Sequence, residues 1–139
     1  MSTQLFVDAG AWIALADADD QYHQRAAQAY QELLRRYRRL VTTNLAIAEA
    51  YIVIRRALGH TAAMAFLDGL SASPRIEKVY SDPMLEMEAE RILRQYADQD
   101  FSYVDAVSFV LMRHRGLTDA FAFDQHFVTA GFVCVPPAS

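Results

Sequence analysis

With 139 residues, of which 53% are apolar and 22% charged, the chain has the composition of a globular protein, and we expect one domain over residues 1–139. Its net charge of −4 does not suit a general nucleic-acid binder, although 12 of its 13 basic residues are arginines, whose forked guanidinium groups match phosphate geometry. A single cysteine, Cys134, excludes an internal disulfide and a thiolate metal site, and the lack of a signal sequence or a membrane-length apolar run favours a cytoplasmic location.

Strand and helix patterns alternate along the chain. Short apolar segments predict strands at residues 4–7, 40–43, 76–80, 120–123 and 132–135. Longer segments between them predict helices at residues 11–16, 22–38, 44–58, 61–70, 83–97, 102–115 and 125–129. Asn44 is expected to cap the third of these helices. Alternating strands and helices predict an α/β fold in three layers, α/β/α, with a five-stranded parallel sheet covered on both faces.

Two aspartates, Asp8 and Asp124, follow the first and the fourth predicted strands. In an open parallel sheet, functional groups collect beyond the carboxyl ends of the strands, at the point where the strand order reverses. If these two strands are neighbours at that point, the two carboxylates face each other. The alternative is that each aspartate caps the helix that it precedes.

Glu49 lies inside a predicted helix among apolar neighbours, too far from either end for capping. Burying an unpaired carboxylate costs several kcal/mol or forces it to take up a proton, so the side chain must meet solvent, an arginine or a cation. The largely apolar surface of this helix predicts that it is buried, which weakens the solvent option. Arg55 and Arg56 stand at the wrong spacing to pair with Glu49 along the helix. A structural salt bridge elsewhere remains the alternative.

Asp105 stands in the first turn of its predicted helix, where Ser102 and Asp105 fit a capping box. That role does not exclude a second one in a cleft. Carboxylates gathered in one place repel one another unless a cation lies between them, and Mg²⁺ and Mn²⁺ prefer oxygen ligands. A site of this kind orients and acidifies a water molecule and stabilises charge on a phosphodiester. Together the four acids therefore predict a divalent-cation site.

Four blocks of the sequence resemble the PIN domain, specifically the VapC-like toxins of bacterial toxin–antitoxin pairs. These blocks are residues 5–8, 42–49, 101–108 and 121–127, followed by Gly131-Phe-Val. The resemblance implies a metal-dependent endoribonuclease with strand order 3-2-1-4-5. It also implies an RNA substrate, a homodimer and inhibition by a cognate antitoxin whose C-terminal segment enters the site.

The resemblance also implies roles for individual residues. It makes Asp8 and Asp105 ligands of Mg²⁺ or Mn²⁺, and Glu49 a ligand or a base that orients water. Asp124 competes with Asp119 for the fourth position, and we prefer Asp124 because Asp119 falls at the wrong end of its strand. Thr43 and Asn44 resemble a polar pair that supports the site, and their alternative role is the helix cap.

Other side chains carry weaker signals. His126, two residues after Asp124, can reach the rim of a cleft, whereas the four histidines together show no zinc-like spacing. The basic run at residues 35–39 with Tyr37 can contact RNA phosphate and stack a base, or it is simply an exposed helix end. Trp12 and Phe66 are expected to be core or dimer-contact aromatics.

Two other classes of function compete with a nuclease. One is a non-catalytic module that binds RNA or a protein and retains the acids. The other is a phospho-acceptor receiver domain, which also places acids at strand ends. A receiver requires a lysine after a late strand, and the only lysine, Lys78, lies too early in the chain.

Overall fold

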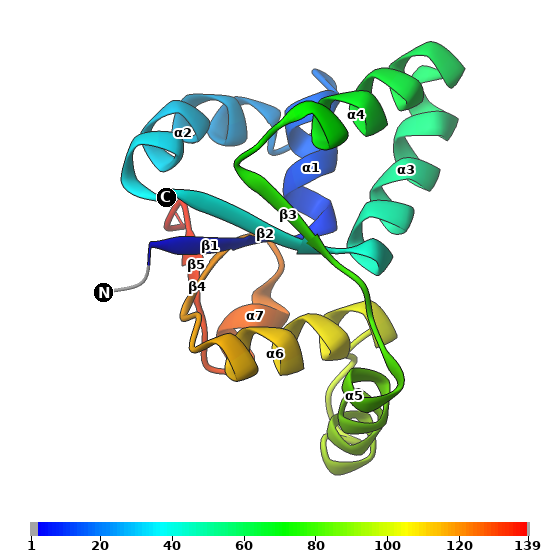
Figure 1. The fold of residues 1–139 in the computed structure, drawn as a ribbon, viewed down its shortest axis with the longest axis vertical. Coiled ribbons are helices and arrows are strands. Elements are labelled where there is room, and N and C mark those ends of the chain that lie inside the picture. The colour runs from blue at the N-terminus through cyan, green and yellow to red at the C-terminus, as the bar shows by residue number, and fades with distance from the viewer. Residues whose placement is uncertain (1–2, 139) are drawn as a thin grey trace.

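The computed structural model, which describes residues 3–138, has the three layers predicted from the sequence (Figure 1). Every strand pair is parallel, and the sheet has the order β3-β2-β1-β4-β5. The strands are β1 (Gln4–Val7), β2 (Arg39–Thr43), β3 (Ile76–Val79), β4 (Asp119–Phe121) and β5 (Val133–Val135). The predicted α/β class and strand order are therefore confirmed.

Helices cover both faces of this sheet (Figure 1). On one face lie α1 (Ala9–Ala16), α2 (His23–Arg36), α3 (Asn44–Leu58) and α4 (His60–Ala72). On the other face lie α5 (Pro83–Gln95), α6 (Tyr103–Arg115) and α7 (Gln125–Thr129). Over the described residues, no helix combines the length and the apolar character that crossing a membrane requires.

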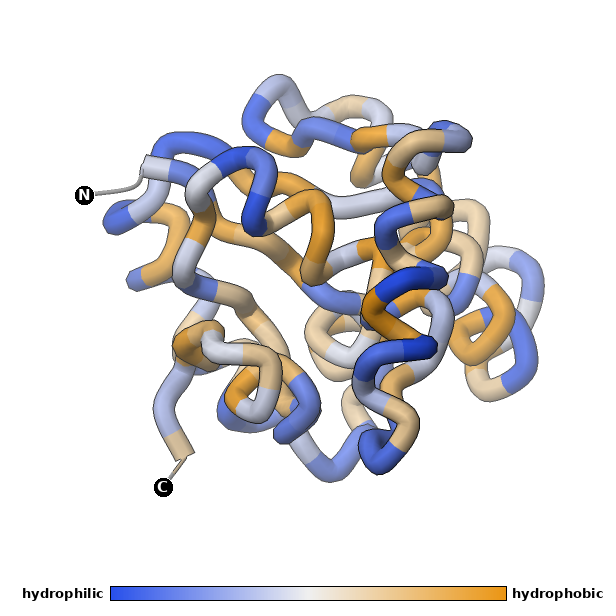
Figure 2. The backbone as a smooth tube through the Cα atoms, turned by 90° about the horizontal axis from the view of Figure 1, so that it is seen from below, coloured by the Kyte–Doolittle hydropathy of each residue, from blue (hydrophilic) through white to orange (hydrophobic). Residues whose placement is uncertain are grey.

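Each central strand contributes side chains to two hydrophobic cores, one on each side of the sheet, because successive side chains point to opposite faces. In β1, Leu5 and Val7 pack against α1 to α4, whereas Phe6 packs against α5 to α7. All three side chains are fully buried, which explains why a central parallel strand reads as a continuous apolar run. In Figure 2, hydrophobic segments run through the interior of the molecule and hydrophilic segments lie mostly towards its outside.

The end of α2 differs from the prediction. The helix stops at Arg36 rather than residue 38, because Tyr37 is extended and its ring is buried. The Tyr37 hydroxyl donates a hydrogen bond to Asp119 Oδ2 at 2.5 Å. The guanidinium of Arg75 donates to the carbonyl groups of Leu34 and Tyr37, which the helix itself leaves unpaired. Stacking of a base on Tyr37 is therefore wrong as a prediction.

The start and surface of α3 also differ. Thr43, not Asn44, caps the helix, since its hydroxyl accepts a hydrogen bond from the Ala46 amide at 3.0 Å. Asn44 instead accepts a hydrogen bond from the Ser81 amide. The prediction that apolar character buries the whole helix is wrong, because Ile52 and Val53 are 49% and 39% exposed. No element of the described chain covers that face.

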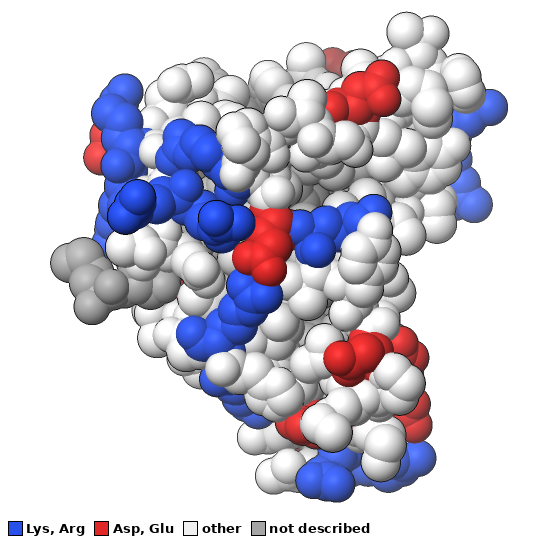
Figure 3. All heavy atoms as spheres, in the orientation of Figure 1, with Lys and Arg blue, Asp and Glu red and all other residues white. Residues whose placement is uncertain are grey.

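Basic side chains gather on the side of the molecule where α2 lies (Figure 3). Arg35 and Arg36 end α2, Arg39 begins β2 and Arg115 ends α6, so these cations lie at the amino ends of the strands. Glu77 of β3 lies among them, 2.6 Å from Arg115 and 3.9 Å from Arg39. Contact of this basic surface with RNA phosphate stays a prediction.

Candidate functional site

A cleft of about 410 Å³ opens at the opposite edge of the sheet, beyond the carboxyl ends of β1 and β4. Acidic side chains from separate parts of the chain line it. They are Asp8, Asp20, Glu49, Asp100, Asp105 and Asp124. The structure thus brings together the four acids that the sequence analysis selected, and adds two more.

Asp8 lies at the middle of this edge of the sheet because it follows β1, the central strand. Its amide donates to the Phe121 carbonyl of β4, and its own carbonyl accepts from the amides of Ala11 and Trp12, so the backbone holds both the strand end and the start of α1. The carboxylate makes no capping hydrogen bond to the described first turn of α1. It is 7% exposed and faces the cleft. The structure therefore does not support the alternative, in which the Asp8 side chain caps α1.

The pKa of Asp8 is raised to about 7. Burial is the main cause, and the negative charge of Asp105 is the next. The Ala9 amide lowers this pKa, while the charges of Glu49 and Asp124 raise it further. The carboxylates therefore act on one another electrostatically, as neighbours in one site.

A buried threonine positions Asp8. The Thr42 hydroxyl donates to the Val7 carbonyl at 2.8 Å and accepts from Trp12 Nε1 at 3.2 Å. It thereby ties the last residue of β1 to β2 and to α1. The supporting role that the family resemblance implies for Thr43 and Asn44 stays a prediction; like Thr42, they are not among the described residues that line the cleft.

Asp105, Asp124 and His126 form a compact group on the other side of the cleft. His126 Nδ1 lies 3.1 Å from Asp105 Oδ2 and 3.3 Å from Asp124 Oδ1. Ser102 and Asp105 form the predicted capping box of α6, and Asp124 caps α7 by accepting from the His126 amide. Both aspartates therefore cap a helix and face the cleft, so the two roles coexist.

Asp105 and His126 shift each other's pKa. Burial raises the pKa of Asp105 more than the hydrogen bonds from His126 and the Ser102 amide lower it. Burial lowers the pKa of His126, but the hydrogen bond to Asp105 and the charges of Asp124 and Asp105 raise it above its ordinary value. When protonated, His126 would partly offset the negative charges of Asp105 and Asp124.

Glu49 contributes to the cleft from the exposed surface of α3. The prediction that Glu49 is buried is wrong. Its apolar neighbours suggested that another element packs over this side of α3, but none of the described elements does. Loss of solvent contact, followed by the charges of Asp105 and Asp124, nevertheless raises its pKa. Among residues 3–138, no basic side chain forms a salt bridge with Glu49, so the structure does not support the salt-bridge alternative.

Asp119 lies outside this group. It begins β4, at the amino end of the strand, and accepts hydrogen bonds from Tyr37 and Thr118. Asp124, three residues beyond the end of β4, is the acid that lines the cleft. Of the two candidates for the fourth position, the structure places only Asp124 beside the other three acids.

The donor set fits a divalent cation. Ligand atoms of Asp105, Asp124 and His126 lie within 4.8 Å of one another. Carboxylate oxygens are the ligands of hard ions such as Mg²⁺ and Mn²⁺, and a cation here would offset the charge of Asp124, which adds to the effect of burial in raising the pKa of Asp105.

The sequence profile of the PIN domain matches residues 5–133. The chain belongs to the PIN-domain family.

Relatives of this PIN domain include a nuclease. The 23S rRNA-specific endonuclease VapC20 of Mycobacterium tuberculosis, found in two strains, is 37% identical over 134 residues, which are 96% of this chain and 98% of the relative. The crystal structure of VapC20, a sarcin-ricin loop cleaving toxin, matches with a TM-score of 0.88 at 32% identity, over 96% of this chain and 99% of that chain. FitAcB from Neisseria gonorrhoeae shares the fold, with a TM-score of 0.62 at 12% identity and 94% coverage of both chains.

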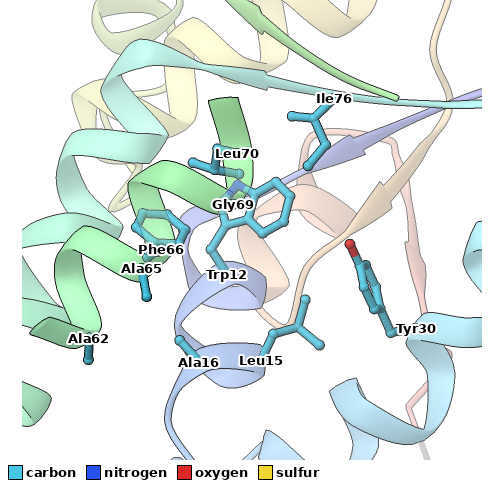
Figure 4. A pocket seen from close by; sticks show the side chains of 10 residues that line it. All are labelled: Trp12, Leu15, Ala16, Tyr30, Ala62, Ala65, Phe66, Gly69, Leu70 and Ile76. Atoms are coloured by element: carbon cyan, nitrogen blue, oxygen red, sulfur yellow. The ribbon is translucent and has the colours of Figure 1, made fainter. Parts of the chain in front are cut away.

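The PIN domain also has an apolar groove of about 470 Å³ between α1, α2 and α4 (Figure 4). Its lining residues are Trp12, Leu15, Ala16, Tyr30, Ala62, Ala65, Phe66, Gly69, Leu70 and Ile76. The rings of Trp12 and Phe66 lie 6.3 Å apart in its wall. Trp12 is buried, so the core role expected for it is confirmed, whereas Phe66 is partly open to the groove.

Sequence reasoning missed two features of the site and undervalued a third. The sequence does not show which of Thr42 and Thr43 bonds to the Val7 carbonyl, because the register between β1 and β2 decides which hydroxyl reaches it. Asp20 and Asp100 lie in loops whose course the sequence does not fix. His126 was expected only at the rim of the cleft. The Asp-x-His spacing at the start of a short helix is the signal that could have placed His126 beside Asp124.

Proposed function

We propose that this PIN domain is a Mg²⁺- or Mn²⁺-dependent endoribonuclease that cuts ribosomal RNA as the toxin of a toxin–antitoxin pair. The convergence of Asp8, Glu49, Asp105 and Asp124 on one cleft is the observation that carries this proposal. The similarity to a 23S rRNA-specific endonuclease over nearly the whole chain supports the choice of substrate. Pairing with an antitoxin follows from the VapC-like character of the chain.

Each acid has a role that follows from its position. Asp8, held at the end of β1, and Asp105, held by the capping box, would bind the cation together with Asp124. Glu49 is exposed at the cleft and would orient a water molecule and accept its proton. A bound divalent cation would supply positive charge to the scissile phosphate and increase the acidity of that water.

Cation dependence of RNA cleavage tests the proposed function. Purified protein incubated with ribosomal RNA and Mn²⁺ or Mg²⁺ should produce discrete fragments, because the four carboxylates need a cation before they can act on a phosphate. EDTA should abolish the fragments, and excess Mn²⁺ should restore them. Primer extension maps the cut positions. Binding of RNA without cleavage under every cation condition would instead favour the non-catalytic module.

The apolar groove supports a protein partner. An amphipathic helix that docks in a groove buries its apolar face, as an antitoxin segment would here. Ala65 is an exposed residue of α4 in the groove wall, so Ala65→Glu places a charge in the docking surface without entering the core. In cells that also express a cognate antitoxin, this variant should regain toxicity, whereas the wild-type protein stays neutralised.

Ala27→Glu provides the matched control, because Ala27 is exposed on α2 and does not line the groove. Growth curves and co-purification of the two proteins measure the outcome. Neutralisation of Ala65→Glu as complete as that of the control variant would exclude the groove as the docking surface.

A further inference from the structure

Two aromatic rings lie face to face in the wall of the acidic cleft. Tyr22 and Phe123 stack with ring centroids 4.6 Å apart and planes only 1° from parallel. Tyr22 comes from the connection between α1 and α2, and Phe123 from the segment that joins β4 to α7. Both rings are partly exposed and both line the cleft. Phe123 directly precedes Asp124, so the pair lies beside the acidic group.

The connection that carries Tyr22 is held by its own polar groups. Asp17 accepts a hydrogen bond from the Asp19 amide, and Asp20 accepts one from the Tyr22 amide, both at 2.9 Å. The next residue, His23, places Nδ1 2.7 Å from the Ala14 carbonyl. These hydrogen bonds hold the backbone that carries Tyr22, and stacking on Phe123 holds its ring.

Electrostatics make an uncharged contact necessary at this site. Within the part of the chain that the structure describes, the cleft is lined by six carboxylates and by no lysine or arginine. These carboxylates repel the RNA backbone until a cation binds, and one divalent cation offsets only part of their negative charge. Stacking of a base on an aromatic ring is insensitive to this charge and is worth about 1–3 kcal/mol per base.

We propose that Tyr22 and Phe123 form a stacking platform for one unpaired nucleobase of the RNA, next to the phosphate that the acids act on. This inference rests on the proposed nuclease function and specifies its substrate. Bases within an A-form helix are already stacked and their major groove is too narrow for side chains, so a platform of this kind selects a nucleotide in a loop, bulge or single strand.

Tyr22 and Phe123 also pack against the hydrophobic core below α1 to α4, but unlike fully buried aromatic residues they keep part of their surface exposed. Phe121, whose ring lies 6.2 Å from that of Tyr30, is fully buried. By contrast, the Tyr22–Phe123 pair faces the cleft, and the Arg25 guanidinium lies 5.2 Å from the Phe123 centroid. Arg25 also donates to the Pro137 carbonyl, which fixes its place beside the ring. With Tyr22 stacked on one face of Phe123 and Arg25 over its ring, the face left for a base is the side of Tyr22 turned away from Phe123.

The test replaces the ring while keeping an apolar side chain. Binding is measured in the Asp8→Asn background, so that RNA stays intact, with an RNA hairpin that carries 2-aminopurine in its loop beside the cut site. Stacking should quench the fluorescence of this base. Tyr22→Leu should weaken binding about 5- to 140-fold and abolish quenching, whereas Tyr22→Phe should stay within about 3-fold of the Tyr22 protein.

Tyr80→Leu makes the same chemical change at an exposed tyrosine outside the cleft and should leave binding unchanged. A hairpin that lacks the base at the same position tests the protein without mutation: it should bind as weakly to the Tyr22 protein as the full hairpin binds to Tyr22→Leu. Binding of the abasic hairpin to the Tyr22→Leu variant should be no weaker than binding with either change alone.

The outcomes separate this inference from the nuclease function. If the wild-type protein cuts RNA with Mn²⁺ but the Tyr22→Leu variant and the abasic hairpin leave affinity unchanged, the stacking platform is wrong and the nuclease stands. If the wild-type protein cuts no RNA, yet binding depends on both the ring and the base, the platform stands and the nuclease is wrong. Equal melting temperatures of the Tyr22 variants show that any loss does not come from unfolding.

Discussion

Substitution of Asp105 with asparagine is expected to lower kcat/KM for RNA cleavage by about 10³-fold or more. Removing one charged ligand costs several kcal/mol of charge stabilisation at the scissile phosphate, and each 1.36 kcal/mol corresponds to a factor of about ten. Asparagine keeps the size of the side chain and an oxygen that can accept from the Ser102 amide, so the capping box and the fold should persist. Single-turnover cleavage across a range of Mn²⁺ concentrations measures the effect.

Asp119→Asn is the matched control for this variant. Asp119 lies at the amino end of β4 and contacts Tyr37 rather than the cleft, so its replacement should affect stability through that hydrogen bond and leave cleavage unchanged. Circular dichroism spectra should show that both variants are folded. Similar cleavage by the two variants would show that Asp105 does not take part in the reaction.

Asp8→Asn is expected to stabilise the cation-free protein at pH 8 by up to about 4 kcal/mol. In the folded protein the pKa of Asp8 is about 7, whereas the value without burial is 3.8. A group whose pKa is raised on folding binds its proton more tightly in the folded state, so losing that proton destabilises the fold. A difference of about three pKa units corresponds to about 4 kcal/mol.

The pH dependence has a definite sign. Below about pH 4, Asp8 is protonated in both the folded and the unfolded chain, so the wild-type protein and the Asp8→Asn variant should be about equally stable. Between pH 4 and pH 7 the unfolded chain has lost the proton and the folded chain retains it, so the stability of the wild-type protein falls as pH rises. Above pH 7 the full penalty is present, and the variant should show its largest advantage.

Thermal unfolding of both proteins at pH 4, 6 and 8, with EDTA and then with Mn²⁺, provides the measurement. Mn²⁺ should raise the melting temperature of the wild-type protein at pH 8 much more than that of the variant, because the cation offsets a charge that the variant lacks. A melting temperature of the variant at or below that of wild type in EDTA at pH 8 would show that repulsion at Asp8 is absent.

Much of the site could be predicted because its acids sit at positions that local rules define. Asp8 follows a buried strand, Asp105 stands in a capping box, and Asp124 precedes a short helix, all of which are visible in the sequence. Glu49 lines the cleft, but its exposure was not predicted. The burial of α3 depends on which elements pack against its apolar face, and the residues of α3 alone do not reveal that.

The remaining parts depend on tertiary geometry. Contact between His126 and Asp105 requires α7 to start beside the start of α6, and the pairing of Tyr22 with Phe123 requires one loop to fold over another. Tyr37 shows the reverse case: its basic neighbours suggested an exposed residue, but the ring fills the space below α2 and bonds to Asp119. Neighbouring residues in sequence do not reveal which of them turns inward.

The distribution of charge along the sheet makes this molecule an electric dipole. Arginines collect at the amino ends of the strands and carboxylates at the carboxyl ends, which the four-residue strand β1 separates by only about 13 Å. An approaching polyanion is therefore drawn to one pole and repelled from the other. At physiological salt this field decays over about 8 Å, so it orients only molecules that are already near the surface.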